Sequence, residues 1–264
     1  MSKLDTKSLA SEVASPHFWR RQTAQRLLVE RAEERRALLG TKAFTAPKPS
    51  DARRSDESAA PVLRALLADQ NSVPSTLITA LRTLDGLNAL TPAGVQPFIG
   101  HADVGVRVHA LQLADRWFAK DEGRAVLDTT IAAAASETSP RVPIQVALSL
   151  GESRDPRAFA MLARYAREKL TVRWMDVAVL SLLHGRAGEM LDELLREPGG
   201  SGAWLPSLAQ SIAAHRNETE LSRAINLAAT VKPELRSGKS ARATSDRRSA
   251  AFTPLHPAPG FGRS

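Results

Sequence analysis

The chain has 264 residues, 43% of them hydrophobic and only 5% aromatic, with no cysteine and a formal net charge of +8. The absence of cysteine excludes disulfides, thiolate metal sites, cysteine nucleophiles and attached c-type haem. Alanine and leucine dominate the apolar residues, which favours closely packed helices over a β-rich fold.

The positive charge lies at the two ends of the chain. Residues 1–57 carry 12 Lys and Arg against 8 Asp and Glu, and residues 236–264 carry 6 against 1. Residues 58–235, with 18 against 19, are nearly neutral. Because a nucleic-acid-binding solenoid is expected to carry a basic stripe along its body, this distribution argues against nucleic acid as the partner.

The first part of the chain predicts one interrupted pair of helices. Residues 1–14 are polar and predict a short helix or a frayed lead-in. Ser15-Pro16 then begins a longer helix, with serine as the cap and proline at the first helical position. Residues 40–57 are rich in Pro, Ser, Lys and Arg and predict a flexible insertion loop. Pro61–Asp69 predicts the second helix of this pair.

A helical pattern centred on an alanine recurs along the chain. In one copy Val106, Ala110, Leu113 and Trp117 fall on one helix face. From Ala80 onward the central alanines are 30, 37, 31 and 31 residues apart, as in stacked helical units. The alanines, with a more distant copy near the start, are Ala24, Ala80, Ala110, Ala147, Ala178 and Ala209.

A second helix is predicted after each of these alanine-centred helices, and the short links favour antiparallel packing. Gly86 falls near the end of its helix, where a left-handed closing residue is favoured, and Gly151 ends another helix. The predicted pairs are Ser75–Leu87 with Pro92–Ile99, Asp103–Ala119 with Gly123–Ala135, Pro140–Leu150 with Pro156–Lys169, Val172–Leu183 with Gly188–Arg196, and Trp204–His215 with Glu218–Val231.

The sequence therefore predicts an all-α fold, a right-handed α-solenoid of about six HEAT-like two-helix repeats over residues 15–231. Its stability is expected to come from alanine and leucine faces buried between neighbouring units. Residues 232–264 are basic and rich in Pro and Ser, which predicts a disordered tail.

Three segments carry a resemblance to a known family: SPHFWRRQTAQRLLVER (Ser15–Arg31), ITALRTLDGLNALTP (Ile78–Pro92) and HADVGVRVHALQLAD (His101–Asp115). They resemble the HEAT-repeat region of the PVC-type haem-binding proteins of planctomycetes and verrucomicrobia, also described as membrane-bound dehydrogenases. The resemblance covers roughly residues 12–230.

Members of that family join a propeller similar to sugar dehydrogenases, this helical region and often a cytochrome c with a CxxCH motif. Nothing in this chain resembles a propeller, and without cysteine it has no CxxCH. The insertion at 40–57 also interrupts the family's usual helical hairpin. The resemblance therefore implies the helical module alone, in the periplasm if the chain is a fragment, and no redox residue is carried over.

The polar residues form no recognisable catalytic, cofactor-binding or metal-binding pattern. No two of the 6 histidines have the spacing of local metal ligands. His109 adjoins the buried face of its helix, and we expect a partly buried, hydrogen-bonded core residue. The carboxylate pairs Asp121-Glu122 and Asp192-Glu193 are expected to be solvated, because neighbouring helical residues do not face each other. We assign no cofactor.

Arginines and tryptophans of the first helices are expected to have structural roles. In HEAT repeats an arginine near the position of Arg107 or Arg173 commonly bonds an aspartate of a neighbouring turn. Asp103, which is also placed to cap its helix, is the expected partner. Packing between units is expected for the tryptophans, whereas an exposed concave row would indicate a ligand groove. They are Trp19, Trp117, Trp174 and Trp204.

These features favour a non-enzymatic scaffold that presents a surface to a protein partner. Two alternatives stay open: a nucleic-acid binder assisted by its basic ends, which would show steep salt dependence, and a detached segment of a periplasmic redox protein. No apolar run is long enough for a membrane span, and the N-terminus lacks the apolar core of a secretory signal. The compartment is otherwise open.

Overall fold

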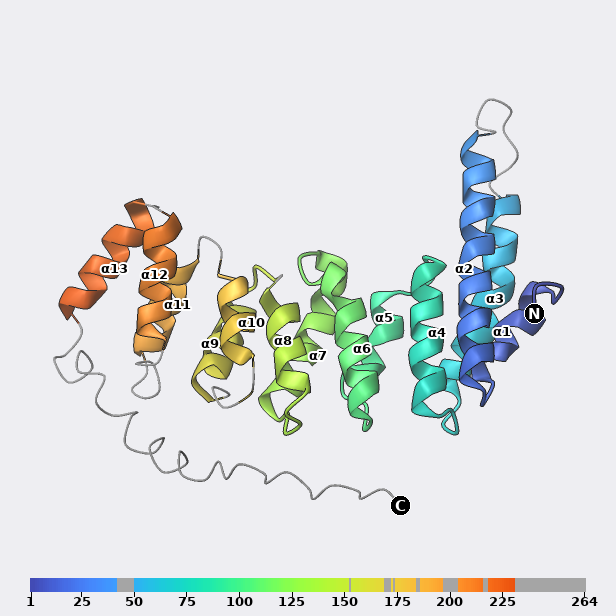
Figure 1. The fold of residues 1–264 in the computed structure, drawn as a ribbon, viewed down its shortest axis with the longest axis horizontal. Helices are drawn as coiled ribbons and strands as arrows, with labels where there is room; N and C mark the ends of the chain where they lie inside the picture. Colours follow the sequence, from blue (N-terminus) through green and yellow to red (C-terminus); the bar gives the residue numbers. More distant parts are fainter. Residues whose placement is uncertain are drawn as a thin grey trace, which may run out of the picture. The chain divides into compact units, whose positions relative to one another are not determined.

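The computed structural model is all-helical over the residues that it describes, which confirms the predicted all-α class. These residues are 78% helical, contain no strand and form 13 helices (Figure 1). The described residues are 1–41, 50–151, 153–168, 172, 174–183, 186–196, 204–215 and 218–230. The predicted tail at 232–264 and Arg173 lie outside these ranges.

The chain forms two compact units, Met1–His184 and Gly185–Ser264, each described by itself. The second unit contains α11 (Ala187–Arg196), α12 (Leu205–His215) and α13 (Glu218–Thr230). The α-helices of the first unit are α1 (Thr6–Ser11), α2 (Phe18–Thr41), α3 (Ser50–Ala68), α4 (Pro74–Gly86), α5 (Pro92–Val95), α6 (Val104–Ala114), α7 (Arg124–Ala135), α8 (Val142–Gly151), α9 (Pro156–Glu168) and α10 (Met175–Ser181). Short 3-10 turns in this unit are η1 (Glu12–Ala14), η2 (Gln96–Phe98), η3 (Asp115–Trp117) and η4 (Asp121–Gly123).

The division between the units separates the two helices of the fifth predicted pair. α10 packs on α8 and α9 in the first unit, whereas α11 packs on α12 and α13 in the second. Residues 15–231, expected to form one array of repeats, are therefore divided between two compact units. The physical reason is that each of the two helices buries its apolar side chains against helices of its own unit.

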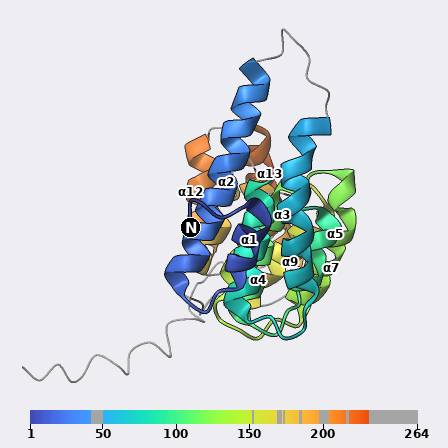
Figure 2. The ribbon, with the colours of Figure 1, turned by 90° about the vertical axis from the view of Figure 1, so that its right-hand side faces the viewer.

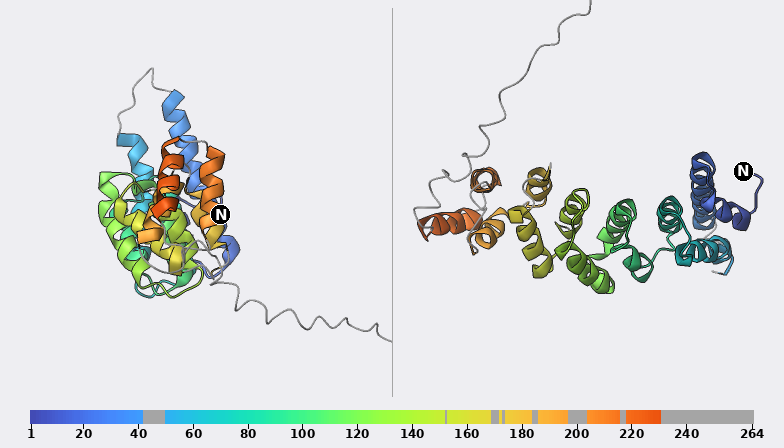
Figure 3. Two further views of the ribbon diagram at one scale, coloured as in Figure 1. Left: turned by 90° about the vertical axis from the view of Figure 1, so that its left-hand side faces the viewer. Right: turned by 90° about the horizontal axis from the view of Figure 1, so that it is seen from below.

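Within the first unit, the predicted first helices form one layer and the second helices another (Figures 1 and 3). In the first layer α2, α4, α6, α8 and α10 follow one another, and each contacts the next. In the second layer α5 contacts α7, and α7 contacts α9. This repeat-like architecture is compatible with an α-solenoid.

The N-terminal segment is a folded part of the first unit rather than a lead-in. Asp5 caps α1 by accepting a hydrogen bond from the Ser8 N–H at 2.7 Å. Leu9, Ala10 and Val13 are completely buried. α1 packs against both α2 and α3 (Figure 2). The polar composition of this segment hid the fact that these three apolar residues face the core.

The prediction of an insertion loop over residues 40–57 is wrong at both ends of this range, which are helical. α2 continues to Thr41, and α3 already begins at Ser50. Residues 42–49, the rest of the predicted loop, lie outside the described residues. Pro61, expected to start the second helix, lies inside α3. The prediction failed because it relied on missing apolar periodicity, whereas Ala, Arg and Glu have good helix propensity even on a fully polar turn.

Five of the six repeat alanines are buried, and the sixth is exposed. Ala24, Ala80, Ala110 and Ala147 have no exposed surface, and Ala178 is 6% exposed. The expectation of an inward alanine is wrong for α12, where Ala209 is exposed. Here Leu208 and Ile212, four residues apart, define the buried face, and the next residue after Leu208 points about 100° away from it.

Two helix-ending glycines provide space for side chains of neighbouring helices. A Cβ on Gly86 would lie 2.6 Å from Val29 Cγ2, and one on Gly151 would lie 2.5 Å from both methyl carbons of Leu182. The left-handed residue expected at Gly86 is instead Asn88, with φ of 57°. The carbonyl oxygen of Leu84, near the end of α4, accepts hydrogen bonds from the backbone N–H groups of the two residues that follow Asn88.

Candidate functional site

A ladder of polar side chains crosses three consecutive helices of the first layer. Arg82 of α4 donates from Nε to Nδ1 of His109 on α6 at 3.1 Å, and from Nη2 to Oε1 of Gln112. Gln112 Nε2 donates to Oε1 of Gln145 on α8 at 3.1 Å. Gln145 Nε2 donates to Ser149 Oγ at 3.1 Å. The ladder joins α4, α6 and α8 by side chains that satisfy one another.

His109 is half-buried and hydrogen-bonded, as predicted. Burial, and then the positive charge of Arg82, lower the pKa of the imidazole below its ordinary value. Because Nδ1 accepts from Arg82, the neutral ring carries its proton on Nε2. His109 therefore serves as an uncharged acceptor between two helices.

Arg107 is held by a different carboxylate from the one expected. Its Nε donates to Oε2 of Glu137 at 3.0 Å, and its Nη2 donates to Oε1 at 3.1 Å. Its Nη1 donates to the carbonyls of His101 and Ala102. Asp103, the predicted partner, instead accepts from the Val106 N–H at 3.0 Å and caps α6. Because the Asp103 carboxylate accepts from the backbone of its own helix, Arg107 pairs instead with Glu137, which lies in the link between α7 and α8.

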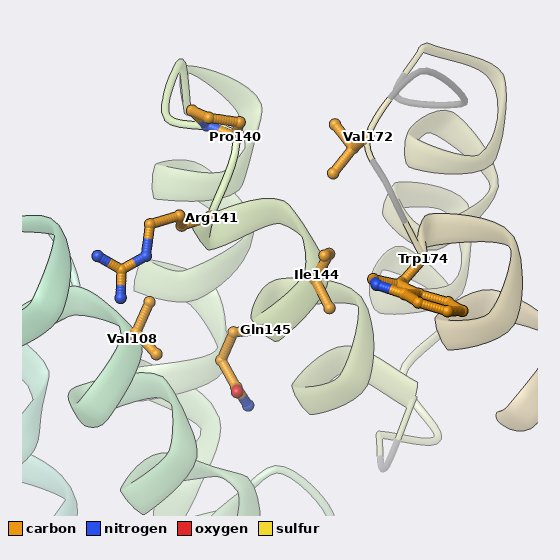
Figure 4. Close-up of a pocket in the computed structure, with 7 residues that line it drawn as sticks. All are labelled: Val108, Pro140, Arg141, Ile144, Gln145, Val172 and Trp174. Atoms are coloured by element: carbon orange, nitrogen blue, oxygen red, sulfur yellow. The ribbon is translucent and has the colours of Figure 1, made fainter. Parts of the chain in front are cut away.

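An open, mainly apolar hollow of about 570 Å³ lies beside this ladder (Figure 4). α6, α8 and the two residues before α8 form one part of its wall, and residues of the segment that leads into α10 form another. Its size falls within the range of ordinary ligand pockets. The lining residues are Val108, Pro140, Arg141, Ile144, Gln145, Val172 and Trp174.

Trp174 is the largest side chain in this hollow and the least expected one. The residue is 57% exposed and has a φ of 70°, a left-handed conformation that bulky residues rarely adopt. In Figure 4 its indole lies on the same side of the hollow as Ile144, with Arg141 and Val108 on the other. An exposed aromatic ring held on a strained backbone is a feature typical of functional surfaces.

Apolar side chains continue along the two helices that border the hollow. Leu148 follows Ile144 by one turn of α8 and is 37% exposed. Val177 follows Trp174 by three residues, in the first turn of α10, and is 52% exposed. Residues four apart share a helix face, as Ile144 and Leu148 do on α8, and α8 contacts α10. We call these four residues and the hollow the Trp174 surface.

The other tryptophans divide between core and surface. Trp117 and Trp204 are buried, as expected. The core prediction is wrong for Trp174 and for Trp19, which is 66% exposed beside Phe18 at 68%. The exposed pair lies at the start of α2, at the other end of the first layer from α10 (Figure 1). The two exposed tryptophans therefore form no row.

The carboxylate pairs stay on helix surfaces or helix starts. Asp121 and Glu122 are exposed in η4, and Asp192 and Glu193 are half-exposed in α11. Within the described ranges, no three His, Cys, Asp or Glu side chains gather as potential metal ligands. No helix in the same ranges is both long and apolar enough to cross a membrane.

Sequence reasoning missed the ladder and the hollow. A signal for the ladder exists, because Arg82 and Gln112 each follow a central alanine by two residues. No local pattern marks Arg141 or Ile144 as neighbours of Trp174. The chain matches no family model, and no curated protein matches it.

Proposed function

We propose that the chain is a non-enzymatic scaffold built from HEAT-like repeats as a right-handed solenoid, and that its first unit binds a protein partner. The observation that carries this proposal is the Trp174 surface. Exposed tryptophans in apolar surroundings often contribute most of the free energy of protein binding. The ladder beside it supports binding by fixing the positions of α4, α6 and α8 before a partner arrives.

The state of the arginines favours a protein partner over nucleic acid. Phosphate recognition needs free cationic groups along the body. Several arginines of the first unit are instead paired: Arg107 with Glu137, Arg157 with Asp128 and Asp155, Arg164 with Glu168, and Arg116 with Asp85. Pairing lowers the positive potential that this surface offers to phosphates.

The proposal is tested by selecting peptides from a random display library on the full chain. Peptides that use the Trp174 surface should bind wild type and lose about tenfold or more in affinity with Trp174→Ala, because buried aromatic anchors dominate such interfaces. Trp19→Ala is the matched control, since it removes a similarly exposed tryptophan from a distant helix. Failure to enrich any peptide that depends on Trp174 would contradict the proposal.

The family resemblance carries a second proposal, that these residues are the helical segment of a larger redox protein. The observation that favours it is the order of the three resembling segments, Ser15–Arg31, Ile78–Pro92 and His101–Asp115. Sequencing the genomic flanks tests it. A propeller-encoding sequence upstream and a CxxCH motif downstream would support the proposal, and unrelated flanking genes would overturn it.

A further inference from the structure

We propose that the Trp174 surface takes an acidic peptide segment, in which apolar side chains lie on Trp174 and Ile144 and a neighbouring carboxylate pairs with Arg141. This inference rests on the proposed function and specifies the chemistry of the partner.

The charge complementarity comes from Arg141. It is the charged residue among the described residues that line the hollow, and it is exposed. Its backbone N–H donates to Ser139 Oγ, but its guanidinium has no partner among the described residues, unlike the guanidinium groups of Arg107 and Arg157, which are paired. A free guanidinium beside an apolar hollow offers two parallel donors to a carboxylate.

The remaining polar group of the hollow is already occupied. Gln145 is 9% exposed, and its amide accepts from Gln112 and donates to Ser149. A ligand that competed for this amide would break the ladder. Among the described lining residues, Arg141 thus offers a free ionic contact and the others offer apolar contacts, which fits a partner with a carboxylate beside apolar side chains.

The extent of the apolar surface favours a peptide over a small molecule. The hollow is open to solvent, and exposed apolar side chains continue beyond it at Leu148 on α8 and Val177 on α10. A small carboxylic acid would fill the hollow alone. A peptide several residues long covers the hollow and these two neighbours, and so buries more apolar surface.

The test compares the peptides that a random display library yields on the full-length wild type, Arg141→Glu and Arg154→Glu. We expect the wild-type peptides to combine aliphatic or aromatic residues with Asp or Glu. Arg141→Glu should weaken these peptides by about fivefold, because an exposed ion pair contributes up to about that factor and the new carboxylate repels the acidic residue. It should also enrich peptides with Lys or Arg at the acidic position. Arg154→Glu is the control, because it changes the net charge by the same amount as Arg141→Glu at an exposed residue outside the hollow. It should leave binding unchanged.

The outcomes separate the two proposals. Peptides that depend on Trp174 but show no acidic preference, and bind wild type and Arg141→Glu equally, would overturn the acidic partner and leave the proposed function standing. The absence of any peptide that depends on Trp174 would overturn the function itself. Equal weakening by Arg154→Glu would show a general charge effect and overturn the contact at Arg141. A free hydrophobic acid, such as indole-3-acetate, that competes as strongly as the peptides would assign the site to small molecules instead.

Discussion

At the scale of single residues, burial decides which of the sequence features matter. The repeat alanine Ala110 has no exposed surface, and its small side chain permits close packing of α6 against its neighbours. The buried pair of Arg107 and Glu137 has side chains only 14% and 7% exposed. Such a pair is costly to break, because removal of one partner leaves a buried charge alone.

Ala110→Arg should destabilise the first unit by about 3–5 kcal/mol, since it places an unpaired charge in a closely packed interface. Thermal unfolding followed by circular dichroism measures the effect. Ala132→Arg is the control, because this alanine of α7 is exposed. An unchanged melting temperature for Ala110→Arg would show that the buried face of α6 is assigned wrongly.

His109 makes the stability of the first unit depend on pH. Its pKa in the folded protein lies below the ordinary value of 6.5 because of burial and Arg82. Between the two pKa values the unfolded state binds more protons than the folded state. Stability should therefore fall as the pH falls below 6.5, until the folded pKa is passed. His109→Asn keeps an acceptor for Arg82 but does not titrate, so its melting temperature should fall less between pH 7 and pH 5. Parallel pH profiles for both proteins would contradict this assignment.

At the scale of elements, capping residues determine where helices begin, and small residues such as glycine determine how closely helices approach one another. Asp103 and Thr91 cap α6 and α5 as short polar residues do at helix starts. Gly151, by contrast, matters through a residue 31 positions later, because Leu182 occupies the space where a Cβ would lie. At position 151, helix propensity therefore favours alanine over glycine, whereas the contact with Leu182 favours glycine.

Gly151→Ala should destabilise the protein by about 1 kcal/mol. Overpacking against Leu182 typically costs 1–3 kcal/mol, which outweighs the helix propensity gained by alanine. In a Leu182→Ala background the clash is absent, so the same substitution should be neutral or stabilising. Urea denaturation of the four proteins of this cycle measures the coupling, with Gly100→Ala, where a Cβ meets nothing within 4 Å, as a control. Additive effects would mean that α8 and Leu182 do not approach closely.

At the scale of the whole molecule, the chain contains two compact units, Met1–His184 and Gly185–Ser264. In stacked helical units, stability is a sum over units and their nearest-neighbour interfaces. α8 packs against α6, α9 and α10, and all of these helices belong to the first unit. We therefore expect the first unit to fold without the second.

A fragment of residues 1–184 is expected to unfold cooperatively, with helical content typical of this part of the full chain. A shorter fragment, 1–151, lacks α9 and α10 and exposes the apolar face of α8, so it should melt at a lower temperature. Circular dichroism and denaturant unfolding compare the two. If 1–184 has no cooperative transition, the first unit requires the rest of the chain.

The sequence by itself determined the all-α class and most helix positions. Apolar periodicity, capping residues and early prolines act within a few residues, so they can be recognised without the fold. It predicted the helical nature of α3 only from Pro61 onward, because the earlier turns have helix propensity but no apolar face.

Only the tertiary structure decided which residues meet across helices. Arg107 lies four residues from Asp103 but pairs with Glu137, and Arg141 and Trp174 line one hollow although 33 positions separate them in the sequence. A tryptophan has the same local pattern whether it is buried or exposed, and its surroundings depend on how distant helices pack. The candidate binding surface could not be predicted from the sequence for this reason.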